Sequence, residues 1–413
     1  MRTYQELFRV PEFKPLFAAV ACMVAGGTVT SLALATVVFD RTGSALLAAV
    51  SMFGASFAQV LGATTLLSLG DHLPPRRTTV VLALVFAAAA LALSRPGTPV
   101  PVMLAIVLGV GLVNSVGGAV RWGLVSEILP EDGYLLGRSV LNMAGGVVQI
   151  AGNGVGAALL GFASPRAALL LSACLYLTGA LVARFGLTRR PPRAAGRPTV
   201  RQTWRVNRRL LADRAVRRVY LALWVPNGLV VGAEALFVPY AGASAGALFM
   251  AAALGTLAGN TAVGRFVPKH RRSALALPLP LLMAVPYLLF PLRPGLAAGV
   301  LLVGAASVGF STGLLWQDRL VALVPPEIRG QALGLHSSGM LTLQALCAAG
   351  AGLAAGRLSP AAAMALMAGL SVLVTLALAP GLRRDAAPGP ARGRTAGQTL
   401  TPKSSAMPRS PEA

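Results

Sequence analysis

Long apolar segments without charge alternate with short polar segments along almost the whole chain. Windows that contain no Asp, Glu, Lys or Arg cover residues 15–39, 42–70, 78–94, 96–120, 139–165, 167–183, 235–264, 273–292, 294–317, 330–356 and 358–382. An α-helix needs about 20 apolar residues to cross about 30 Å of hydrocarbon, and most of these windows are long enough. The window 235–264 continues an apolar run that begins near Val219 and breaks at residues 241–246. Residues 219–264 therefore hold two spans, and the pattern predicts twelve transmembrane helices.

The composition agrees with this pattern. Hydrophobic residues make up 55% of the chain and charged residues only 12%, with a mean hydropathy of +0.70, whereas a soluble domain carries about 25% charged residues. Cys22, Cys174 and Cys347 all lie in apolar windows without the spacing of metal ligands. We therefore predict an all-α membrane protein and expect neither a metal nor a cofactor.

The net charge of +23 is distributed unevenly. Arginines crowd a linker at 188–218, a tail at 383–413 and the loops around 76–77 and 269–272, while the alternate loops carry single arginines. The positive-inside rule then places both termini in the cytoplasm of a multi-pass protein of the cell membrane. The excess of arginine reflects this topology and attraction to anionic lipid, so we expect no nucleic-acid partner.

Two short motifs recur in the second half of the sequence. "GDHLPPRR" (70–77) matches "GRFVPKHRR" (264–272), and "SEILPEDGYLLGR" (126–138) matches "VALVPPEIRGQALG" (321–334). The glycine of the first motif and the proline of the second are 60 residues apart in one half (130 − 70) and 62 in the other (326 − 264). The chain therefore divides into two six-span bundles, 1–187 and 219–382, related as parallel repeats.

These motifs resemble the major facilitator superfamily of transporters over about residues 7–382. "SLGDHLPPRRTT" (68–79) is similar to the signature loop between the second and third spans of that family. "PEFKPLFAA", "VFDRTGSALLAA", "EILPED" and the glycine-rich fifth span (144–161) resemble the exporter-type branch, although Asn153 stands where a proline is usual. The resemblance implies a monomeric carrier with an alternating-access fold that moves small molecules, with protons as the coupling ion.

The loop at 68–79 is predicted to latch one conformational state. Asp71 can accept hydrogen bonds from a helix N-terminus, and the family resemblance implies that its partner is the start of the eleventh span, near 330–335. Arg121, low in the fourth span, is a second partner for Asp71. Arg76 and Arg77 can bond helix carbonyls or the acids Glu127, Glu131 and Asp132. The alternative is that these charges serve topology alone.

Glu234 is the one carboxyl that the sequence places well inside a span. Because a charge at the centre of a membrane helix costs about 2.5–3.5 kcal/mol, such a residue is by default a functional hypothesis. We predict a proton or substrate site, with a neutral carboxyl that packs the seventh span against the eleventh as the alternative. Pro226, Asn227 and Gly228 predict a local break in the same helix.

Uncharged polar residues inside the spans are candidates for the wall of a transport cavity. They are Asn114, Gln149, Asn153, Asn227 and Gln344. Buried amides also hold membrane helices together, at about 0.6–2 kcal/mol each, so each of these residues has a structural alternative. His336, at the start of the eleventh span, is interpreted as a capping or interfacial residue.

Export and uptake both remain open at the level of sequence. An enzyme would need clustered carboxylates or histidines in the spans, and the phosphate-binding loop of an ATP-driven pump does not occur. Proton-driven export of small amphipathic molecules is favoured by the fifth span and the exporter resemblance. The alternative is an uptake symporter or facilitator for a small metabolite.

Overall fold

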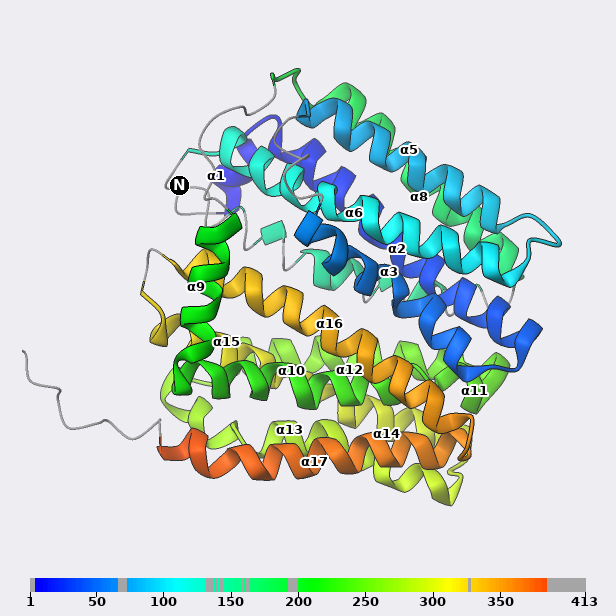
Figure 1. Cartoon of the computed structure of the whole chain (residues 1–413), viewed down its shortest axis with the longest axis vertical. Coiled ribbons are helices and arrows are strands. Elements are labelled where there is room, and N and C mark those ends of the chain that lie inside the picture. The colour runs from blue at the N-terminus through cyan, green and yellow to red at the C-terminus, as the bar shows by residue number, and fades with distance from the viewer. Residues whose placement is uncertain are drawn as a thin grey trace, which may run out of the picture.

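In a computed structural model, the protein is a pair of helical bundles (Figure 1). The structure describes residues 4–65, 73–130, 163–191, 200–325 and 328–384, with residues 137, 140–141, 144–149, 151–152, 154–156 and 159 between the fourth and sixth spans. No strand occurs among these residues. Nine helical segments in this part of the chain are long and apolar enough to cross a bilayer, and Ala45–Val60 and Pro278–Leu292 are shorter apolar helices. The predicted all-α membrane fold is confirmed.

The first bundle follows a short helix α1 (Tyr4–Arg9). It contains α2 (Phe13–Thr42), α3 (Ala45–Thr65), α5 (Pro75–Leu93), α6 (Val100–Ile128) and α8 (Pro165–Gly186). Local signals in the sequence set several of these bounds. Gly43 ends α2 in a left-handed conformation (φ 62°), and its N–H donates to the carbonyl of Phe39 at 2.8 Å. Pro75 and Pro165 occupy the first positions of their helices, where no N–H partner is needed.

The second bundle begins with α10 (Arg214–Glu234), after the linker helix α9 (Val200–Ala212). Its other elements are α11 (Phe237–Ala241), α12 (Ala245–Thr261), α13 (Pro278–Ala284) with the 3₁₀ helix η4 (Val285–Leu292), α14 (Leu296–Val308), α15 (Thr312–Leu323), α16 (Arg329–Ala355) and α17 (Pro360–Arg384). The ninth span changes from α to 3₁₀ geometry where Pro286 and Pro291 remove backbone donors.

The expected break at Pro226–Gly228 is not present, because α10 continues through these residues and turns only at Ala235–Leu236. Packing against neighbouring helices accounts for the continuity. Ser371 of α17 donates to the Pro226 carbonyl at 3.2 Å. Gly228 lies directly against the backbone of Leu343 on α16. The glycine therefore permits a close helix–helix approach and does not open the helix.

The two bundles use the same helix pairings. In the first, α2 and α5 pack on α8, and α3 packs on α6; in the second, α10 and η4 pack on α17, and α12 packs on α14. Numbered by span, the first bundle pairs span 1 with span 6, span 3 with span 6, and span 2 with span 4. The second bundle pairs span 7 with span 12, span 9 with span 12, and span 8 with span 10, which are the same pairs shifted by six. The bundles meet where α3 packs on α16.

The bundles have one strongly basic end, on the left of Figure 1, which we call the basic end. It carries Arg76, Arg77, Arg190, Arg271 and Arg272, together with α9. The opposite end holds the α2–α3 junction at Gly43 and the turn from α16 to α17. The position of a residue along the bundle axis is given by whether it lies nearer the basic end or the opposite end.

The fold generates a prediction about helix packing in the first bundle. A Cβ atom on Gly111 of α6 would lie 2.2 Å from the Ala55 carbonyl oxygen of α3, whereas a Cβ on Gly109 would meet nothing within 4 Å. Gly111→Val should therefore destabilise the protein by about 1–3 kcal/mol through overpacking. The matched change Gly109→Val should not. Thermal unfolding of both purified variants measures the difference, and equal melting temperatures would contradict this packing.

Candidate functional site

The central cavity lies between the two bundles, with a volume of about 500 Å³. Its walls are formed by Val20, Val24, Arg121, Leu141, Gly145, Gly146, Gln149, Gln317 and Ser337. Arg121, Gln317 and Ser337 all lie within about two turns of the basic ends of their helices, α6, α15 and α16. The cavity is therefore displaced toward the basic end. It presents apolar side chains from α2 and polar ones from both bundles.

At the opposite end the bundles are in direct contact. A Cβ on Gly352 of α16 would lie 2.6 Å from Cα of Leu46, at the start of α3. Next to this contact there is a small apolar cluster, formed by Ala49 of α3, Ala235 at the end of α10 and Ala348 of α16. Such small residues allow membrane helices to approach closely. The bundles therefore touch at the opposite end, beside a pocket of about 420 Å³ that is lined by Leu46, Pro239 and Gly352 among others.

Trp224, His336 and Gln317 form a polar cluster at the edge of the cavity that the sequence did not predict. Trp224 of α10 donates from Nε1 toward the His336 carbonyl at 3.0 Å and toward His336 Nδ1 at 3.2 Å. His336 Nε2 lies 3.3 Å from Gln317 Nε2. His336 is thus an interfacial residue between α10, α15 and α16. Gln317 and Ser337, the neighbour of His336, face the cavity. His336 is 112 positions from Trp224 and 19 from Gln317, on three different helices, so spacing alone could not reveal the cluster.

The amide side chains that were predicted to line the cavity lie in different parts of the structure. Gln149 lines the cavity, whereas Asn153 lies outside the described residues. Gln344 donates to the Asn227 side-chain oxygen at 2.8 Å and ties α16 to α10. Asn114 donates to Gln59 at 3.0 Å and ties α6 to α3. Gln59 is itself a polar residue inside a span, and it is not among the residues predicted to line the cavity.

Glu234 lies in the second bundle, away from the residues that line the central cavity. The Tyr287 hydroxyl donates to its Oε1 at 3.2 Å, so the carboxyl connects α10 to η4 of the ninth span and not to the eleventh. Phe237 stacks on Tyr287, with ring centroids 6.3 Å apart, and Phe249 packs edge-on against Phe237 at 5.0 Å. The carboxyl therefore has a neutral hydrogen-bond partner in aromatic surroundings.

Polar contacts at the basic end of the first bundle involve an arginine that the sequence analysis did not select. Arg190 pairs with Glu12 at 2.7 Å and with Glu127 at 3.6 Å. The Thr188 N–H also donates to Glu12 at 3.2 Å. Burial acts to raise the pKa of Glu12, but these hydrogen bonds and the charge of Arg190 outweigh it, so the pKa lies below its usual value.

The predicted loop arginines are only partly accounted for. Arg76 donates to the carbonyl of Arg184, in the last turn of α8, which agrees with the expected bond to a helix carbonyl. Arg77 is exposed. Asp71, Glu131 and Asp132 lie outside the described residues, so the latch through Asp71, with Arg121 or the start of α16, stays a prediction.

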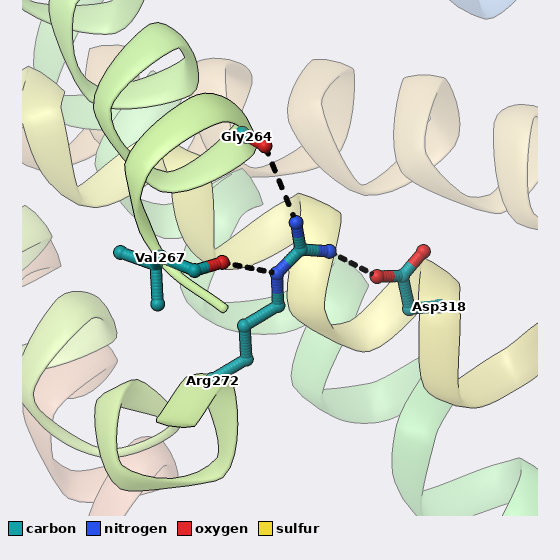
Figure 2. A network of polar contacts seen from close by, with 4 residues as sticks. All are labelled: Gly264, Val267, Arg272 and Asp318. Carbon is teal, nitrogen blue, oxygen red and sulfur yellow. Dashed lines mark hydrogen bonds and ion pairs between the residues drawn. The ribbon is translucent and has the colours of Figure 1, made fainter. Parts of the chain in front are cut away.

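The repeated loop in the second bundle forms a polar network within that bundle (Figure 2). Arg272 donates from Nη1 to Asp318 Oδ2 on α15 at 2.6 Å, and it also bonds the carbonyls of Val267 at 3.3 Å and Gly264 at 3.4 Å. The arginine thus connects the end of the eighth span to the tenth. The repeat at 264–272 marked this arginine in the sequence, but nothing there indicated Asp318 as its partner.

Comparisons with known proteins agree with this architecture. The family described as Major Facilitator Superfamily matches residues 16–317. A solved POT family transporter in complex with 5-aminolevulinic acid has a TM-score of 0.69 at 11% identity, covering 91% of this chain and 96% of that chain. The nucleoside transporter NupG gives 0.66 at 12% identity, with 90% and 99% covered. A peptide transporter POT in complex with alafosfalin gives 0.66 at 14%, with 93% and 99% covered. No curated protein matches the chain.

The contact at the opposite end predicts the effect of a wedge between the bundles. Gly352→Val should force α16 away from α3, because its side chain would overlap Leu46. Gly350→Val is the matched control, since a Cβ there meets nothing within 4 Å. In a protein that carries Cys22→Ser, Cys174→Ser and Cys347→Ser, spin labels at Ser44→Cys and Ser359→Cys, across the opposite end, should report a longer distance in the Gly352 variant only. An unchanged distance would show that this contact does not close the molecule.

Proposed function

The chain belongs to the Major Facilitator Superfamily and is a membrane transporter, and we propose that it exports small amphipathic molecules in exchange for protons by alternating access. The observation that carries the proposal is the asymmetry between the two ends. The bundles touch at Gly352 and Leu46, beside a smaller pocket of about 420 Å³, whereas the central cavity of about 500 Å³ lies toward the basic end. If the basic end faces the cytoplasm, as the positive-inside rule requires, the cavity is on the side where an exporter loads its substrate.

The lining of the cavity supports an amphipathic substrate. Val20, Val24 and Leu141 offer an apolar wall, and Gln149 and Gln317 offer amide groups from the two bundles. Binding sites for small molecules combine apolar contact with a few polar groups that fix orientation. Because the two amides come from different bundles, a substrate bound to both would experience different contacts when the bundles rock. Such a difference in contacts is what a ligand needs to shift a conformational equilibrium.

Everted membrane vesicles that contain the protein test the direction and the driving force. With the vesicle interior made acidic, a fluorescent amphipathic probe such as ethidium should accumulate, and nigericin, which dissipates the pH gradient, should abolish the accumulation. A panel of cationic, neutral and anionic dyes covers the unknown substrate. Movement that ignores the gradient would replace this proposal with a facilitator. Accumulation only in right-side-out vesicles with acid outside would replace it with an uptake symporter.

Glu234 is the group that we propose to carry the coupling proton. Its partner Tyr287 is neutral, so the protonated carboxyl fits the described state, and ionisation would require a change in solvation as the bundles move. Glu234→Gln mimics the protonated form. Exchange of probe down its own gradient should therefore persist, while uphill transport driven by the pH gradient should vanish.

Asp40→Asn is the matched control for this test, because Asp40 is an exposed carboxylate at the end of α2. This variant should retain uphill transport. Retention of uphill transport by the Glu234→Gln variant would eliminate Glu234 as the coupling site. Loss of both exchange and uphill transport in the same variant would assign Glu234 to substrate binding or to structure.

A further inference from the structure

The linker helix α9 has a strongly one-sided sequence, VRQTWRVNRRLLA, with four arginines and no carboxylate. Its inner face is packed: Leu210 is 4% exposed and Val206 contacts the same apolar cluster, which belongs to the second bundle. Asn207 on this face accepts a hydrogen bond from Gln331, in the first turn of α16, at 3.0 Å. The helix is therefore docked on the start of the eleventh span.

The corner after α9 holds the helix across the ends of the spans. Asp213 caps α10 by accepting from the N–H groups of Ala215 at 2.8 Å and Val216 at 3.0 Å. Arg217 donates to the Leu211 carbonyl at 3.1 Å, near the end of α9. As a result α9 runs across the basic ends of α10 and α16, and not along them (Figure 1). In a bilayer this direction is parallel to the membrane surface.

The outer face of α9 joins aromatic and cationic side chains. Trp204 is 63% exposed and Leu211 is 36% exposed; because they are seven positions apart, they share one edge of the helix. Arg208 is exposed one turn from Trp204 on that edge, and Arg205 and Arg209 are exposed farther round the outer face. A tryptophan prefers the boundary between hydrocarbon and headgroups, and helices with arginines next to such an edge lie in the interfacial plane of acidic membranes.

We propose that the outer face of α9 is a binding surface for anionic phospholipid headgroups, and that bound lipid holds the start of α16 in place. Trp204 and Leu211 enter the interface, and the three arginines contact the headgroup phosphates. Arginine beside an acidic lipid surface strengthens association by about fivefold per residue. Because Gln331 links α9 to the first turn of α16, the lipid contact is transmitted to a helix that packs across the two bundles.

The contact can be measured without knowledge of the transported substrate. Leu211→Cys, labelled with bimane in a full-length variant that carries Cys22→Ser, Cys174→Ser and Cys347→Ser, reports lipid at α9. The protein is reconstituted in phosphatidylcholine vesicles that contain equal fractions of spin-labelled phosphatidylglycerol or spin-labelled phosphatidylcholine. Quenching by the acidic lipid should exceed quenching by the neutral lipid several-fold. The excess should fall with added salt, because headgroup attraction is screened.

The combined change Arg205→Gln, Arg208→Gln and Arg209→Gln should remove the preference for acidic lipid. The control removes the same charge from exposed arginines of the opposite end, with Arg95→Gln, Arg166→Gln and Arg357→Gln, and should retain the preference. Melting temperatures of both triple variants verify that they are folded. Equal quenching by the two lipids in the unsubstituted protein would overturn the proposal, as would a preference that survives the α9 substitutions. Absence of quenching by either lipid would also overturn it, because this face would then not contact the bilayer.

Discussion

Direct backbone contact at glycine joins helices within each bundle and across the two bundles. Gly111 lies against Ala55 in the first bundle, Gly255 lies against Gly304 in the second, and Gly352 lies against Leu46 between them. Within a bilayer, apolar burial does not drive helices together, since lipid tails are as apolar as leucine, so close van der Waals packing takes that role. The same kind of contact therefore joins helices within each bundle and joins the two bundles at the opposite end.

The contacts within the bundles and the contact between them differ in the polar groups added to them. Inside each bundle, amides reinforce the packing: Asn114 bonds Gln59, and Asn227 bonds Gln344. At the opposite end, the cluster of Ala49, Ala235 and Ala348 between the bundles is purely apolar. A membrane hydrogen bond is worth about 0.6–2 kcal/mol. In the proposed alternating-access cycle, a contact without such bonds is the easier one to separate.

The ion pairs of the described residues lie at the ends of the helices, at the basic end of the molecule. Arg190 with Glu12 and Glu127, and Arg272 with Asp318, connect neighbouring helix ends within one bundle. These pairs join helices of the same bundle and do not cross between the bundles. The proposed proton site at Glu234 differs from them, because its partner Tyr287 is neutral. A carboxyl with a neutral partner is not held in its ionised form by a nearby cation, so its protonation can follow its solvation, as the proposed coupling requires.

The uncharged apolar windows along the chain predicted the helical class and the spans, because the cost of placing charge in hydrocarbon acts on each residue by itself, and the recurring loop motifs predicted the two matching halves. They also identified Glu234, Gln149 and the loop arginines as polar residues that need an explanation. Only the tertiary structure decided their partners: Tyr287 for Glu234, Gln344 for Asn227, and the group of Trp224, His336 and Gln317 beside the cavity. It also showed that Gly228 serves packing, where the sequence had suggested a broken helix. The physical reason is that the spacing of residues along a helix decides only which face of that helix a side chain occupies. Which neighbour this face meets depends on how helices distant in sequence are rotated and how closely they approach at their glycines.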